Sequence, residues 1–301
     1  MRRPGFGLAL PVFDSHRTGF EPLADVGRRA ERLGFDSLWA GDHLFFHSPN
    51  IECLVALAAV AGATEDISLG TGVLLPALRD PVVLAKQLLS VDVVSGGRLI
   101  AGFGVGGEYE REWEVQGIDV RTRGRRTDEA IELWKRFSTG DPVRHEGRHF
   151  HVDAPALSPE PVSDPVPLWI GGRVEAAMRR AVRLGADGWF PGWMTPARVA
   201  SDRERLAEMA AEAGREPPAV GLLLFVYVGD SESGVREAIA FTEQHYAMPW
   251  SVMERYSAVG PAEHVRERLA EYRAAGVEDF ILAPLGGDLL DQHEQLGALK
   301  S

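Results

Sequence analysis

The sequence repeats one kind of joint, in which a helical segment ends at a glycine and a short strand follows almost at once. The glycines of the three copies are Gly34, Gly185 and Gly276. Glycine takes the left-handed conformation that ends a helix without the steric penalty of a Cβ atom. A chain that passes so quickly from helix into strand is typical of parallel sheets, whose strands are joined through helices. The joints therefore predict an α/β fold.

Eight largely apolar segments supply the strands. Several are apolar along their whole length, as strands need to be when helices cover the sheet. Because these segments mostly alternate with helices over 301 residues, they predict a single (β/α)8 TIM barrel domain at 1–301, with a doubly wound sheet as the alternative. The predicted strands are 6–10, 35–39, 67–75, 99–103, 168–170, 187–190, 220–228 and 279–283.

Proline marks the starts of three helices. A proline is tolerated in the first helical turn, where its missing N–H has no partner to lose. Each of the three follows a residue that can cap a helix. The pairs are Asp80-Pro81, Thr195-Pro196 and Gly260-Pro261.

The segment 140–167 interrupts the alternation. It carries six prolines and a hairpin-like pair of short runs around 146–148. We interpret it as an insertion over the carboxyl-terminal mouth of the barrel. His145, His149 and His151 lie in this hairpin, but no acidic residue stands at clear ligand spacing, so we expect no metal site.

The balance of charge argues against polyanionic partners. The chain has 32 Lys and Arg against 44 Asp and Glu, a net charge of -12, which disfavours general binding to nucleic acid or to anionic membranes. The longest apolar helical run, 54–63, is too short to span a bilayer. The one cysteine, Cys53, lies in an apolar helix and is expected to be buried and inert. We expect a cytoplasmic protein.

Glycines crowd the positions that follow the strands. In a barrel of this kind the functional residues come from the carboxyl ends of the strands. Glycines at those ends predict that backbone approaches a flat or phosphorylated ligand closely. Gly171, Gly172 and Arg173 follow a strand and open a helix, so their N–H groups and the helix dipole favour an anion.

At the second strand the polar residues Asp42 and His43 reach the same end. A carboxylate and an imidazole there can bond to the polar edge of a ring and move a proton near neutral pH. The alternative is that Asp42 caps a loop and His43 only packs. The run at 102–107 satisfies G-x-G-x-x-G, but no acidic residue follows at the spacing of a dinucleotide site, so a nicotinamide site is not expected.

Four stretches together resemble the bacterial-luciferase-like flavin and deazaflavin oxidoreductases. Residues 33–43 are similar to the second-strand signature of that family, and 70–107 with 95–99 to its third and fourth strands. Residues 121–134 and 167–189 extend the resemblance to about residue 195. Beyond that point the resemblance is weaker.

The resemblance implies site residues as well as a fold. His43 is implied to be catalytic, with an acid at Glu108, although Glu110 is nearly as eligible. It also implies a cis peptide bond at Gly72-Val73 and a homodimer, whose interface 51–61 and 82–94 could supply. The implied cofactor contacts are Asp42, Thr71, Gly72, Val73, Gly106, Gly107, Gly171, Gly172, Arg173, Gly192 and Trp193.

The cofactor and the reaction depend on one another. Members of the family that use FMN often carry Glu before the histidine, whereas Gly41-Asp42-His43 favours the deazaflavin coenzyme F420. A deazaflavin supports hydride transfer, whereas reduced FMN supports oxygenation. We therefore expect an F420-dependent oxidoreductase acting on a small organic substrate, with an FMN-dependent monooxygenase as the alternative. Two further alternatives are a non-catalytic flavin-binding protein and a metal-dependent hydrolase or isomerase with Asp42 and His43 as ligands. The sequence does not identify the substrate.

Overall fold

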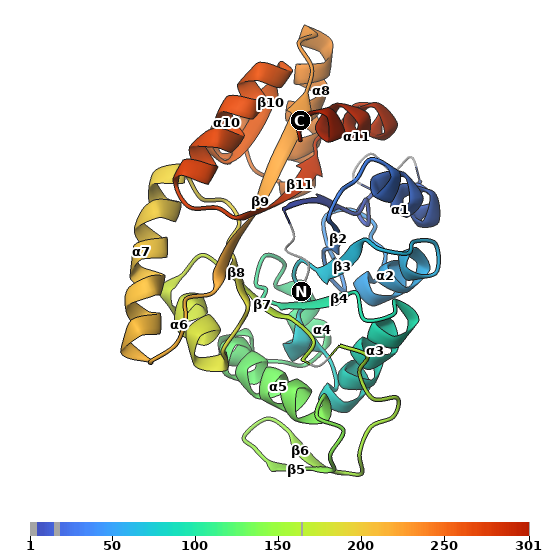
Figure 1. The fold of residues 1–301 in the computed structure, drawn as a ribbon, viewed down its shortest axis with the longest axis vertical. Coiled ribbons are helices and arrows are strands. Elements are labelled where there is room, and N and C mark those ends of the chain that lie inside the picture. The colour runs from blue at the N-terminus through green and yellow to red at the C-terminus, as the bar shows by residue number, and fades with distance from the viewer. Residues whose placement is uncertain (1–4, 15–18, 164, 301) are drawn as a thin grey trace.

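The computed structural model describes residues 5–14, 19–163 and 165–300 and contains a closed parallel barrel (Figure 1). The ends of the predicted domain, 1–4 and 301, lie outside the described residues. Neighbouring strands around the ring are β1 (Phe6–Ala9), β2 (Ser37–Ala40), β3 (Ser68–Thr71), β4 (Leu99–Phe103), β7 (Leu168–Gly171), β8 (Gly188–Phe190), β9 (Ala219–Val228) and β11 (Asp279–Pro284). Pairing of β11 with β1 and of β8 with β9 closes it. The predicted TIM barrel is confirmed.

Helices surround the barrel and alternate with its strands, as Figure 1 shows. Seven of the eight sequence-predicted strands match the observed bounds closely, but 67–75 shortens to β3 because the chain turns away after Thr71. The surrounding helices are α1 (Leu23–Arg32), α2 (Cys53–Ala61), α3 (Pro81–Val94), α5 (Arg123–Phe137), α6 (Glu175–Leu184), α7 (Pro196–Glu212), α10 (Ala262–Ala274) and α11 (Leu289–Ala298).

The predicted joints have the expected backbone. Gly34, Gly185 and Gly276 have positive φ angles of 73°, 65° and 99°. Asp80 and Thr195 cap α3 and α7 with their side chains, each ahead of a proline. The third predicted start is one residue early, because Pro261 is the cap residue of α10 and the helix begins at Ala262.

The inside of the barrel is filled by aromatic rings rather than by branched aliphatic residues alone. The ring centroid of Trp39 lies 5.5 Å from that of Trp169 and 5.4 Å from that of Phe190. A Cβ atom added at Gly70 would lie 2.3 Å from Trp39, and one at Gly188 would lie 2.3 Å from Trp169. Glycine in these strands therefore makes room for the tryptophans, since packed interiors leave no free volume.

The insertion 140–167 does not cover the mouth, and this part of the prediction is wrong. Its strands β5 (Val143–Glu146) and β6 (His151–Ala154) form the predicted hairpin. The hairpin lies on the outer side of α5 (Figure 1), where Glu129 bonds to His145 at 2.9 Å and Arg126 stacks on Phe150. The segment then returns along α3 through bonds from Val162 and Ser163 to Asp92. It joins α5 to β7, so it starts and ends at the amino-terminal side of the barrel.

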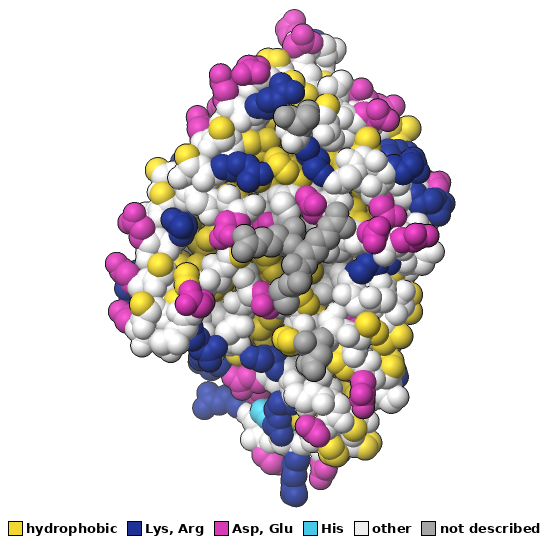
Figure 2. All heavy atoms as spheres, in the orientation of Figure 1, with side chains coloured by type: hydrophobic (Ala, Val, Ile, Leu, Met, Phe, Trp, Pro, Cys, Tyr) yellow, Lys and Arg dark blue, Asp and Glu magenta, His cyan; other side chains and the backbone are white. Residues whose placement is uncertain are grey.

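Other segments lie at the mouth. After β9 the chain forms α8 (Glu232–Tyr246), α9 (Trp250–Met253) and η3 (Glu254–Tyr256) before an additional strand, β10 (Ser257–Gly260), pairs with β9 outside the ring. After β3 and β4 come η1 (Pro76–Leu78), α4 (Arg111–Val115) and η2 (Val120–Thr122). Within the described residues, no helix is long and apolar enough to cross a membrane. Acidic and basic side chains are interspersed over the face in Figure 2.

Candidate active site

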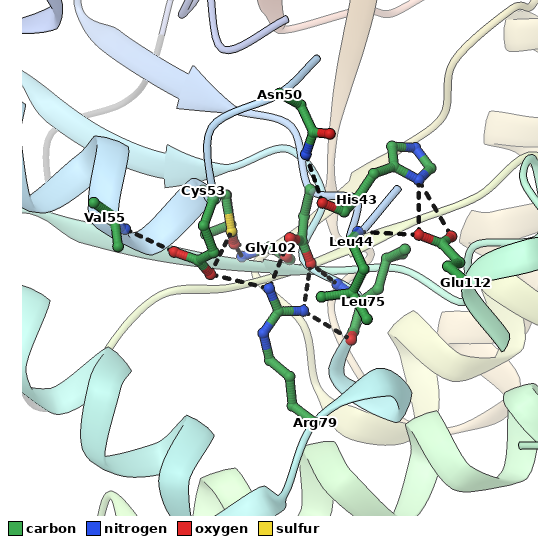
Figure 3. Close-up of polar contacts among 12 residues, drawn as sticks. His43, Leu44, Asn50, Cys53, Val55, Leu75, Arg79, Gly102 and Glu112 are labelled. Atoms are coloured by element: carbon green, nitrogen blue, oxygen red, sulfur yellow. Dashed lines mark hydrogen bonds and ion pairs between the residues drawn. The ribbon is translucent and has the colours of Figure 1, made fainter. Parts of the chain in front are cut away.

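His43 is held by a buried carboxylate at the carboxyl end of β2. Its Nδ1 lies 3.2 Å and 3.3 Å from the two oxygens of Glu112, which comes from α4 (Figure 3). The Glu112 side chain is fully buried, whereas that of His43 is 13% exposed. The same carboxylate accepts the Leu44 N–H at 3.1 Å, and Asn50 donates to the His43 carbonyl. The ring is therefore anchored on both its side chain and its backbone.

This anchoring selects one form of the imidazole. When Glu112 is ionised its carboxylate only accepts hydrogen bonds, and the contact then requires the proton to be on Nδ1 of His43. The other ring nitrogen, Nε2, is then the one able to take up a proton from a bound molecule. A carboxylate that fixes the tautomer and orientation of a histidine is a recurrent device of acid-base sites.

Asp42 is bonded into a second buried network, with Arg79 and Leu75. Its two oxygens accept bonds of 2.7 Å and 2.8 Å from the guanidinium of Arg79, and one of them also accepts the Leu75 N–H at 2.9 Å (Figure 3). Arg79 also donates to Glu52 at 3.0 Å. Asp42 thus fastens the chain that follows β3 to the end of β2. Its predicted contact with a cofactor stays a prediction.

The group Asp42, Glu52 and Cys53 has ligand atoms within 4.8 Å of one another, a spacing that a metal ion could use. The guanidinium of Arg79 already bonds both carboxylates, so a second cation would meet its charge. Burial, and then the charges of Asp42 and Glu52, raise the pKa of the Cys53 thiol well above its ordinary value. The residues therefore favour a buried ion pair beside an inert thiol.

The predicted cis peptide bond at Gly72-Val73 is confirmed. The preceding Thr71 hydroxyl donates to the Gly102 carbonyl at 2.7 Å and accepts the Gly102 N–H at 2.8 Å, which ties β3 to β4. A Cβ atom at Gly104 would lie 2.3 Å from the Val73 side chain. One at Gly171 would lie 2.7 Å from it, so these rim glycines accommodate Val73.

The predicted anion site lies at the start of α6, but its donors differ in part from the prediction. The Gly172 N–H donates to the Phe190 carbonyl at 3.3 Å, so it is not free for an anion. The helix begins at Glu175. Ala177 in its first turn donates its N–H to the Val174 carbonyl at 2.8 Å, so the N–H groups of Glu175 and Ala176 are the ones without a partner in the helix. Their dipole and free donors still favour an anion here.

Arg173 supplies a cation at the same place. Its guanidinium carbon lies 5.0 Å from the ring centroid of Trp193, and among the described residues it forms no ion pair. A cavity of about 320 Å³ adjoins it, lined by Arg173, Trp193, Arg198, Met248, Val252, Met253 and Tyr256. A Cβ atom at Gly192 would meet no atom within 4 Å, so the rim is open beside Trp193.

The two predicted acids follow β4 but do not contact His43 in the structure. Glu108 and Glu110 are exposed. Burial of the Tyr246 phenol, together with the nearby charge of Glu108, raises the pKa of Tyr246. Gly106 and Gly107 have positive φ angles, and Arg123 bonds the Gly106 carbonyl at 3.3 Å.

Glu112 is the residue that the sequence reasoning missed. It lies in the acidic run 108–114, which also reads as a solvated helix face. The signal that could have singled it out is its neighbour Trp113, a large apolar side chain that requires one side of the segment to be buried.

Comparisons with known proteins point to one family. The sequence model described as luciferase-like monooxygenase matches residues 6–279. The chain is 32% identical over 248 residues to an F420-dependent hydroxymycolic acid dehydrogenase of Mycobacterium tuberculosis, covering 78% of this chain and 66% of that protein. Over the first relatives found, the alignments span only 58% to 66% of the relatives' own length.

Solved structures share the fold at low sequence identity. The monooxygenase RslO1 from Streptomyces bottropensis superposes with a TM-score of 0.86 at 21% identity, covering 98% of this chain and 97% of that one. An F420-dependent secondary alcohol dehydrogenase, solved with an F420-acetone adduct, superposes with a TM-score of 0.85 at 20% identity, covering 99% and 98%. At these identities the likeness concerns the fold.

Proposed function

The chain belongs to the luciferase-like monooxygenase family, and from that premise we propose that it is an oxidoreductase. We propose that it binds coenzyme F420 at the carboxyl end of the barrel and transfers a hydride to or from a small organic substrate. The similarity to the F420-dependent hydroxymycolic acid dehydrogenase supports this choice of cofactor. The Gly-Asp-His run at the end of β2 supports it from this chain's own sequence.

The residues at the mouth fit a phosphorylated cofactor with a flat ring system. Arg173 and the first turn of α6 offer a cation and free N–H donors for its phosphate, and the rim is open at Gly192. Thr71, Gly72 and Val73 lie at the carboxyl end of β3, and Gly106 and Gly107 follow β4 at the same end of the barrel, and we propose that these residues support the ring. When bound, a deazaflavin accepts or donates a hydride, whereas reduced FMN also reacts with oxygen.

His43 is the proposed acid-base group. Its Nε2 would take a proton from a substrate oxygen or return one, while Glu112 holds the other ring nitrogen and stabilises the imidazolium that forms. The observation that carries the proposal is this buried Glu112–His43 pair at the strand end, because a histidine that only packs needs no fully buried carboxylate. Glu108 stays the candidate for a second acid.

Titration of the purified protein with coenzyme F420 and, separately, with FMN tests the proposal. Tight binding of F420 with much weaker binding of FMN is expected. The reverse preference would instead support an FMN-dependent monooxygenase. Binding without turnover of any alcohol or ketone would support a non-catalytic flavin-binding protein.

A variant identifies the phosphate position. Arg173→Ala should weaken the binding of a phosphorylated cofactor at least tenfold and leave the affinity for its dephosphorylated form unchanged. Arg215→Ala on the outside of the barrel is the matched control, and it should change neither affinity. Equal loss for both forms of the cofactor would show that the phosphate lies elsewhere.

A further inference from the structure

Aromatic side chains from three separate segments gather around His43. The ring of Phe46 stacks on that of His43, with centroids 4.4 Å apart and an interplanar angle of 24°. Phe13, which follows β1, lies 6.1 Å from His43. His245 of α8 lies 5.1 Å from Phe13 and 5.3 Å from Phe46. We call Phe13, Phe46, His245 and Tyr246 the aromatic wall.

The wall connects the His43 side of the mouth to the Arg173 side. The Tyr246 ring lies 4.4 Å from that of His245, and 5.2 Å from that of Trp193, over which Arg173 lies. The mouth thus has an apolar side at His43 and a cationic side at Arg173. The segment that follows β9 contacts both sides, because His245 and Tyr246 belong to its helix α8.

The polar members of the wall carry no charge at neutral pH. Burial, with the neighbouring His43 and His47, lowers the pKa of His245 to about 4, so its ring is neutral. Burial, together with the charge of Glu108, raises the pKa of Tyr246 above its ordinary value, so it stays a phenol. Neutral imidazole and phenol groups can donate hydrogen bonds to an uncharged oxygen without supplying charge.

Among the described residues, two carboxylates act on the wall and on His43, while His43 and His47 act on His245. Glu112 bonds directly to His43, and the charge of Glu108 reaches Tyr246. Among the described arginines and lysines, Arg173 comes next to this set, since it lies over the ring of Trp193, which contacts Tyr246. A negatively charged substrate beside His43 would lose its hydration against aromatic rings and be repelled by both carboxylates.

We propose that the molecule bound beside His43 is an uncharged, mainly apolar alcohol or ketone, packed against the aromatic wall, and that phosphorylated and carboxylate substrates are excluded. The proposal rests on the proposed function, because that assigns the Arg173 side of the mouth to the cofactor. The oxygen of the bound alcohol or ketone lies toward His43, and the apolar part of that molecule lies against Phe46 and Tyr246.

Binding rather than turnover tests this proposal. The protein, loaded with whichever of F420 and FMN it binds, is titrated by calorimetry with uncharged ketones of increasing apolar size, such as acetone, cyclohexanone and 4-tert-butylcyclohexanone. The carboxylate 4-oxocyclohexanecarboxylate is titrated alongside as the charged probe. Affinity should rise with apolar size, and the carboxylate should bind at least tenfold more weakly than cyclohexanone. Glu108→Gln should reduce the difference in affinity between the carboxylate and cyclohexanone.

Variants locate the ligand. Phe46→Ala should weaken the binding of the largest ketone at least tenfold, with no change in cofactor affinity. Leu290→Ala on α11 is the distant control. Carboxylate binding as tight as that of cyclohexanone, or no binding by any ketone, would overturn the inference even if the cofactor binds. If neither cofactor binds, the proposed function fails, and the same titration on the protein alone still decides whether the wall selects uncharged ligands.

Discussion

Glu112 Oε1 lies 3.2 Å from Nδ1 of His43, although 69 residues separate the two in the sequence. The contact spans two strand ends, because His43 follows β2 and Glu112 lies in the short helix after β4. The carboxylate has no exposed surface, so its charge is compensated by the bonds it accepts from His43 and the Leu44 N–H. Removing either partner therefore changes the chemistry of the other.

His43→Ala should lower kcat by about 10²-fold, the usual scale of lost acid-base catalysis, with cofactor affinity nearly unchanged. The reason is that Nε2 is the free nitrogen of an anchored ring, whereas the anion site lies across the mouth at Arg173. Steady-state kinetics on an authentic substrate and a cofactor titration measure the two quantities. Full turnover by the variant would remove His43 from the mechanism and leave Glu108 or Glu110 as the candidate.

Glu112→Gln should lower kcat at least tenfold and leave KM and cofactor affinity within about twofold, as expected when a positioning group is lost. A glutamine can donate to Nδ1, which favours the tautomer with the proton on Nε2 and removes the acceptor. Glu114→Gln, an exposed neighbour in the same run, is the control. Equal kcat values for the two variants would show that the pair is merely structural.

Asp42→Asn should destabilise the protein by roughly 3 to 5 kcal/mol, because it leaves Arg79 as a buried cation without its bidentate partner. The Arg79 side chain is 12% exposed and that of Asp42 fully buried, so water cannot replace the bonds. Urea unfolding measures the loss, and the exposed pair of Arg236 and Glu232 provides the control. A variant that unfolds like the parent but binds cofactor weakly would instead support the predicted cofactor contact of Asp42.

The barrel could be predicted because its signals are local. A glycine with positive φ at Gly34 or Gly185 and a side-chain cap at Asp80 act within one turn of the chain. The four-residue strand β10 was missed because it pairs outside the ring and carries no long apolar run. The insertion 140–167 was placed at the wrong end because its position follows from the direction of α5, which composition does not reveal.

The candidate site could be predicted only where the functional residues come directly after a strand in the sequence. His43 and the start of α6 are of that kind, and the structure places them at the same mouth. Glu112 depends on a contact between distant segments. The local signal is the neighbouring Trp113, which requires one side of the segment to be buried but does not say which glutamate lies on that side. Part of the glycine-rich rim also has a different cause from the one expected, since Gly104 and Gly171 accommodate Val73.

A homodimer is predicted, with α2 and α3 at its interface. Their outer faces expose Val55, Val83 and Val94 by 63%, 56% and 57%, an apolar surface that a partner would cover. Light scattering should give twice the chain mass of 32.9 kDa, and Val55→Asp should shift the protein toward the monomer. Leu290→Asp on α11 is the matched control. A parent protein that is monomeric at micromolar concentration would refute the prediction.

His293 should make the protein acid-sensitive between pH 6.5 and 4. The side chain is fully buried in α11, and neither ring nitrogen has a hydrogen-bond partner among the described residues. Burial, with the nearby charge of Arg29, lowers its pKa from 6.5 to about 4. The unfolded chain therefore binds the proton first, so the free energy of unfolding should fall as the pH drops from about 6.5 to about 4 and then level off.

The loss from this one group is on the order of 3 kcal/mol, because each pKa unit corresponds to about 1.4 kcal/mol. His293→Phe removes the titrating ring, keeps an apolar ring of similar size in the buried site, and should flatten this part of the pH dependence. His245 titrates in the same range because its pKa is also about 4, so some acid sensitivity should persist in the variant. Urea unfolding at several pH values between 4 and 7 measures both curves, and parallel curves for the parent and His293→Phe would show that His293 is not the cause.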